Sequence, residues 1–68
     1  MILTVRNDFA RYRIDCPADA ELKLDHGGTD YLVVHDGSKP FWLFDDILLD
    51  AARSGEFGLR LVSLEPFN

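Results

Sequence analysis

One thiol, two imidazoles and a set of carboxylates are the groups in this chain that could do chemistry. Cys16, His35 and Asp36 supply the thiol, imidazole and carboxylate of a cysteine nucleophile. Antiparallel hairpins would place the ends of the second and fourth expected strands at the same edge of the sheet, where Cys16 and His35 could approach each other. However, Cys16 alternates with Tyr12 and Ile14, which predicts a buried cysteine in the core. We therefore expect no catalytic residue and no enzyme activity.

The spacing of the candidate ligands disfavours a metal site. His26 and His35 lie at opposite ends of one expected strand, and nine residues at ~3.3 Å each separate them by roughly 30 Å. Asp25 with His26 supplies at most half a site, because neighbouring residues of a strand point to opposite faces. The sole cysteine excludes a Cys-rich zinc site and an intramolecular disulfide. We expect no metal and no cofactor.

Apolar and acidic residues within the helical pattern of residues 39–53 give the best functional hint. Trp42 and Leu49 are seven residues apart and would lie over one another, about 90° from the core-facing stripe of the helix. A tryptophan anchor with carboxylates around it is typical of a protein-binding patch. The expected partner-binding residues are Trp42, Asp45, Asp46, Leu49 and Asp50. The alternatives are a half-buried Trp42 at the sheet edge and a solvated acidic surface.

Alternation of apolar and polar residues predicts four strands in the first half of the chain. They cover residues 2–5, 10–16, 20–25 and 29–35. The turns between them are predicted at residues 7–8, 17–19 and 26–28, and residues 36–38 close the fourth strand. Residues 29–35 are apolar on both faces in their middle, which predicts a central or doubly covered strand.

A helix is predicted over residues 39–53, where the alternation stops. Ser38 is the expected N-cap, with Pro40 in the first turn, and Gly55 is the expected left-handed C-cap after Arg53. The expected core-facing stripe is Phe41, Phe44, Ile47, Leu48, Ala51 and Ala52. A later start is the alternative: Asp45 would then be the N-cap, and residues 41–44 would be extended.

The expected fold class is α+β. Residues 57–64 return to alternation and predict a last strand that ends at Pro66. A chain of 68 residues has room for one small domain, covering residues 1–68. We predict an antiparallel sheet of four to five strands in the order ββββαβ, with the helix packed on one face.

The charge of the chain excludes several classes of partner. Twelve acidic against seven basic residues give a net charge of −5. This argues against nucleic-acid binding, which needs a basic surface, and against anionic membranes. The acidic surface does not suit a DNA mimic either, because the seven basic residues interrupt it. No apolar run approaches the ~20 residues that span a bilayer, and the first residues do not resemble a signal peptide. We expect a cytoplasmic protein.

These features favour a small acidic, non-enzymatic binding protein that docks on a larger macromolecule and regulates or inhibits it. A phage- or prophage-encoded inhibitor of a host protein complex is one such protein. The expected partner is another protein with a basic surface, without direct contact to nucleic acid or membrane, and the chain itself is a monomer or homodimer. The alternative is a structural or assembly subunit that self-associates through the uncharged strand edge of residues 2–5.

Overall fold

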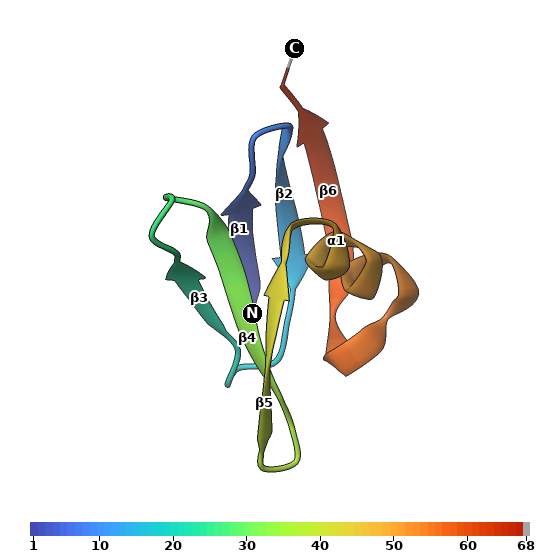
Figure 1. Cartoon of the computed structure of the whole chain (residues 1–68). Helices are drawn as coiled ribbons and strands as arrows, with labels where there is room; N and C mark the ends of the chain where they lie inside the picture. The colour runs from blue at the N-terminus through green and yellow to red at the C-terminus, as the bar shows by residue number, and fades with distance from the viewer. Residues whose placement is uncertain (68) are drawn as a thin grey trace.

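The strands of this protein form two antiparallel three-stranded sheets, β1-β2-β6 and β3-β4-β5 (Figure 1). The computed structural model describes residues 1–67. The elements are, in chain order, β1 (Ile2–Arg6), β2 (Ala10–Asp15), β3 (Glu21–Leu24), β4 (Asp30–Asp36), β5 (Lys39–Phe44), α1 (Asp45–Ser54), the 3₁₀ turn η1 (Glu56–Gly58) and β6 (Arg60–Pro66). The α+β class is therefore confirmed, whereas the expected single sheet is divided into two and a fifth strand precedes the helix.

The first sheet has β2 at its centre, between β1 and β6. Tyr12 and Ile14 are fully buried, whereas Arg11 and Arg13 between them are exposed. This agrees with the alternation of apolar and polar residues from which the strand was predicted. Because the apolar side chains of β2 all point to one side, this sheet has one face toward the core and one toward water.

The second sheet has β4 at its centre, between β3 and β5. Leu32, Val33 and Val34 are all buried, as the apolar run predicted. The turn from β4 to β5 has two residues, because Asp36 pairs with Lys39. Its first residue, Gly37, has φ 64°, a conformation that glycine adopts without steric cost.

The strand β5 occupies the first part of the segment that was predicted to be helical. Its run of apolar residues fits either a helix or a strand, and antiparallel pairing with β4 along its whole length favours the strand. Ser38 therefore lies in a hairpin turn, and the prediction that it caps a helix is wrong. Residues 41–44 are extended, as in the alternative with the later helix start.

The helix α1 begins at Asp45, with Phe44 rather than Asp45 as the N-cap. Its end was predicted correctly. Gly55 is the C-cap with φ 77°, its N–H donates to the carbonyl of Ala51, and Arg53 lies in the last turn. In Figure 1 the helix packs beside β5 and in front of β6.

The core lies where the inner faces of the two sheets meet the helix. Its buried residues are Val5, Tyr12, Ile14, Cys16, Ala20, Leu32, Val34, Leu43, Leu48, Ala51, Ala52 and Leu59. Half of the predicted helical stripe is wrong. Ile47 is 65% exposed, and Phe41 and Phe44 belong to β5 and are each 37% exposed. Leu43 and Leu49, which were expected off the stripe, belong to the core and pack against it, respectively.

The last strand begins at Arg60, later than predicted, because η1 intervenes. The pairing of β2 with β6 shifts register between Arg13 and Ile14, which lie opposite Ser63 and Leu61. In a regular strand Leu61 and Ser63 would share a face. This β-bulge lets Leu61 pack against the core while Ser63 lies on the outer face.

Candidate functional site

A group of aromatic residues lies on the outer face of the second sheet. Tyr31 is opposite Phe44 in the pairing of β4 with β5, and Val33 is opposite Trp42. Alternate residues of a strand share a face, so these four side chains form a two-by-two array. None of them belongs to the core cluster, whereas Leu32, Val34 and Leu43 between them do. The array therefore faces away from the core, and we call it the aromatic face.

The aromatic face is exposed and ordered by its own contacts. The rings of Tyr31 and Phe44 stack with their centroids 4.5 Å apart and an interplanar angle of 19°. Trp42 is 58% exposed, although Val33 opposite it is only 5% exposed. Exposed clusters of large apolar side chains are rare on soluble proteins and typically mark interaction sites. Tryptophan and tyrosine are also the residues that contribute most at such sites.

Charged residues of β3 border the aromatic face. Glu21 lies opposite Val33, and Lys23 lies opposite Tyr31. The two charged groups are 3.8 Å apart, and both side chains are about half exposed or more. An exposed pair of this kind contributes about 0–1 kcal/mol, so it is readily exchanged for contacts with a partner. An apolar centre with a polar border is the usual anatomy of a protein interface.

The acidic residues at the start of α1 form a separate group. Asp45 and Asp46 line a cavity of about 180 Å³. Its other lining residues are Asn7, Asp8, Phe9 and Thr29. Burial, together with the charges of Asp45, Asp30 and Asp46, raises the pKa of Tyr12 to about 12. The three negative charges thus disfavour the ionised form of the phenol.

The five predicted binding residues are only partly brought together. Trp42 and Leu49 do not share a helix face, because Trp42 lies on β5 and Leu49 packs half-buried against the core. Asp50 is exposed on α1, one turn after Asp46. The neighbours that the sequence prediction missed for Trp42 are the stacked rings on β4 and β5. The apolar run of residues 40–44 gave no signal for them, because it has no alternation of apolar and polar residues.

Comparison with protein-family models, curated proteins and solved structures finds no match.

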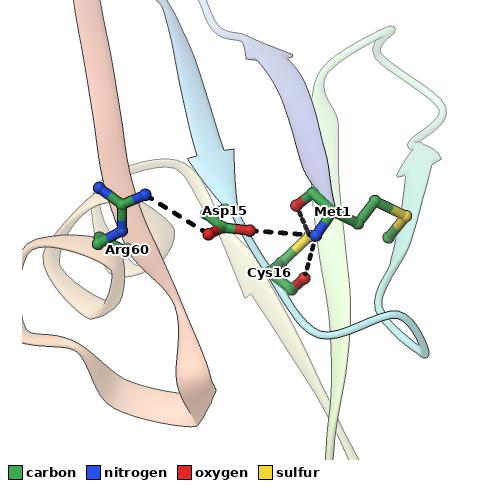
Figure 2. A network of polar contacts seen from close by, with 4 residues as sticks. All are labelled: Met1, Asp15, Cys16 and Arg60. Carbon is green, nitrogen blue, oxygen red and sulfur yellow. Dashed lines mark hydrogen bonds and ion pairs between the residues drawn. The ribbon is translucent and has the colours of Figure 1, made fainter.

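The thiol of Cys16 is buried, as the alternation predicted, with 4% of the residue exposed. Its Sγ donates to the carbonyl of Met1 at 3.4 Å (Figure 2). Burial raises the pKa of this thiol, so it stays protonated at neutral pH. His35 is exposed on β4, in the other sheet. A protonated thiol without a neighbouring base is a poor nucleophile.

Figure 2 also shows how the amino terminus holds the end of β2. The ammonium group of Met1 donates to Asp15 Oδ1 and to the carbonyl of Cys16, both at 3.1 Å. Asp15 Oδ2 accepts from Arg60 at 3.5 Å. The hydrogen bond and charge of the amino terminus, with a smaller contribution from Arg60, lower the pKa of Asp15.

Other kinds of site have less support within residues 1–67. Over this range, no three or more His, Cys, Asp or Glu side chains are arranged to hold a metal ion. The helix of the described chain is too short and too polar to cross a membrane. The aromatic face is therefore the candidate site that the geometry favours.

Proposed function

We propose that this chain is a small, non-enzymatic binding domain that docks on another protein through its aromatic face. The observation that carries the proposal is the exposure of Trp42, at 58%, beside the stacked rings of Tyr31 and Phe44. A short chain has few large apolar residues with which to fill its core. Leaving a tryptophan side chain in water costs free energy unless another molecule covers it.

The arrangement of the aromatic face supports a binding role because it is largely preorganised. The stacked pair limits the rotamers of Tyr31 and Phe44 before any partner arrives. Binding therefore costs less side-chain entropy than it would with freely rotating rings. The side chains of the aromatic face project from the paired strands β4 and β5, and strands hold side chains in place more accurately than loops do.

The charge of the domain defines the kind of partner. The chain has a net charge of −5, and Asp45 and Asp46 directly follow Phe44 at the end of β5. The partner has an apolar pocket for Trp42 and a basic border that meets these carboxylates. Opposite charges at the border increase the rate of association more than the final affinity. A domain bound in this way regulates or inhibits its partner by covering part of its surface.

Affinity capture with matched variants tests the proposal. The tagged protein, its Trp42→Ala variant and its Ile47→Ala variant are incubated with a bacterial lysate, and bound proteins are identified by mass spectrometry. Ile47 is 65% exposed on α1 and serves as the control for loss of an exposed apolar residue outside the aromatic face. The proposal expects one stoichiometric partner that is lost with Trp42→Ala and kept with Ile47→Ala. A folded Trp42→Ala variant that keeps the partner would contradict it.

The second candidate function is self-association through a strand edge. The edge of β1 suits this less than its sequence suggested, because the N–H of Arg6 donates to Asp30 Oδ2 at 3.0 Å. An edge strand of the second sheet, β3, favours it: all four of its residues are exposed, including Leu24 at 66%. Exposed edges of this kind invite pairing between chains. A molar mass that doubles with concentration, and does not do so in Leu24→Lys, would support this function over the first.

A further inference from the structure

The outer face of the first sheet gathers most of the arginines of an acidic protein. Three cross-strand rows make up this face, and we call it the arginine face. The rows are Ile2, Asp15 and Arg60; Thr4, Arg13 and Ser63; and Arg6, Arg11 and Glu65. Four of the five arginines in the chain lie here, and the fifth is Arg53 on α1. With only two carboxylates, the arginine face has a net charge of +2 within a chain of −5.

The two carboxylates of the arginine face are engaged by its outer rows. Glu65 lies 3.3 Å from Arg11, and Asp15 pairs with both Arg60 and the amino terminus. Arg6 lies over the ring of Phe67, with its guanidinium carbon 5.7 Å from the ring centroid. Within residues 1–67, Arg13 in the middle row takes part in none of the ion pairs.

The surroundings of Arg13 suit an oxyanion. Its cross-strand neighbours are the hydroxyl-bearing Thr4 and Ser63. These three residues line a shallow cavity of about 220 Å³ together with Arg11 and Glu65. Guanidinium and hydroxyl groups are donors to carboxylate and phosphate oxygens. The β-bulge between β2 and β6 lies beside Arg13 and places Ser63 in this row; bulges often re-aim a side chain at functional sites.

We propose that the arginine face binds an acidic segment of a partner protein, with Arg13 as the central contact. Arg11 and Arg13 are two residues apart on one strand, so their side chains leave the sheet ~6.6 Å apart. Acidic side chains at alternate positions of an extended peptide have the same spacing. One such carboxylate meets Arg13 between the two hydroxyls, and the next displaces Glu65 from Arg11. The displaced ion pair is exposed and costs little to break.

Two observations favour an acidic peptide over a nucleic acid. The arginine face has a net charge of only +2, which suits a ligand of few negative charges, and the remaining surface of the protein is acidic. Nucleic acids present one charge per phosphate along a continuous backbone and depend on an extended basic surface for affinity. Sheet faces that bind single strands also carry stacking aromatic side chains within the basic surface. Here the stacked rings of Tyr31 and Phe44 lie on the other sheet, and the one ring placed beside the arginine face, that of Phe67, already has the guanidinium of Arg6 over it.

The test is an NMR titration of the full chain at low salt with a short peptide of alternating glutamate and serine. A peptide of alternating glutamine and serine is the uncharged control, and a short oligothymidylate is the nucleic-acid control. Arg13→Gln is compared with Arg53→Gln, because both substitutions make the net charge more negative by the same amount. Both side chains are exposed, so both variants are expected to fold, and their dispersed amide spectra verify this.

The proposal expects amide shifts confined to β1, β2 and β6 on addition of the acidic peptide. Arg13→Gln should weaken binding by about tenfold, as for loss of a charge-assisted hydrogen-bonded pair at an exposed site, and Arg53→Gln by less than about twofold. Equal weakening by both variants would overturn the proposal, because it would reduce the effect to overall charge. Absence of binding, binding of the glutamine peptide with equal affinity, or tighter binding of the oligothymidylate would each overturn it as well.

Discussion

Truncation of two neighbouring helix residues, Ile47 and Leu48, should have very different effects on stability. Both were expected to face the core, but Leu48 is 0% exposed and Ile47 is 65% exposed. Leu48→Ala removes roughly three buried carbon groups at ~0.8 kcal/mol each, and it leaves a cavity among Ala51, Ala52 and the two sheets. We expect a loss of about 3–4 kcal/mol. Only about a third of Ile47 is buried, so Ile47→Ala should cost about 0.5 kcal/mol after the better helix propensity of alanine is included.

Urea unfolding followed by far-ultraviolet circular dichroism measures this difference. A 68-residue domain has a free energy of unfolding of about 3–10 kcal/mol. With a urea dependence of ~1 kcal/mol per molar, the Leu48→Ala midpoint should fall by about 3 M and the Ile47→Ala midpoint by about 0.5 M. A Leu48→Ala variant already unfolded in water agrees with the expectation. Midpoints shifted equally in both variants would refute it, because the helix would then be rotated from the orientation described.

Two further predictions concern titration and backbone conformation. Tyr12 has its pKa raised from 10.0 to about 12, so the protonated phenol stabilises the fold fully below pH 10, and this contribution is lost as the pH rises through 12. Urea unfolding at about pH 9 and about pH 11 should show a smaller loss of stability in Tyr12→Phe than in the parent, and an equal loss would contradict the assignment. Gly58→Ala should lower the melting temperature more than Gly55→Ala, because a Cβ at Gly58 would lie 3.2 Å from Pro17 Cγ whereas one at Gly55 meets nothing within 4 Å. Both glycines have positive φ. Equal melting temperatures of the two variants would therefore show that backbone strain alone determines the loss of stability, and would contradict the prediction.

The sequence was informative wherever a strong period coincided with turn residues. The alternation of Tyr12 and Ile14 with charged residues predicted the orientation of β2 correctly, because only one register keeps arginines in water. The hairpin turn at Gly28 followed from the backbone freedom of glycine, and the end of β4 was predicted at residues 36–38. The helix end at Gly55 followed from the same reasoning.

The run of residues 41–44 was misread because a continuous apolar segment has no period. A helix and a strand both satisfy it, and only the pairing with β4 distinguishes them. Trp42 was therefore expected beside Leu49 on a helix, whereas it lies on β5 near Tyr31 and Phe44, and Leu49 packs against the core. The arginine face could not be predicted from the sequence for another reason. It depends on the pairing of β2 with β6, between residues far apart in the chain.

The position of Trp42 makes the protein its own optical reporter. It is the sole tryptophan of the chain, and it lies on the surface rather than in the core. Its indole is largely hydrated in the folded state, so unfolding changes its emission little. A molecule that covers the aromatic face would remove that water and shift the emission to shorter wavelength. The intrinsic fluorescence of this chain therefore reports on occupancy of the aromatic face more directly than on folding.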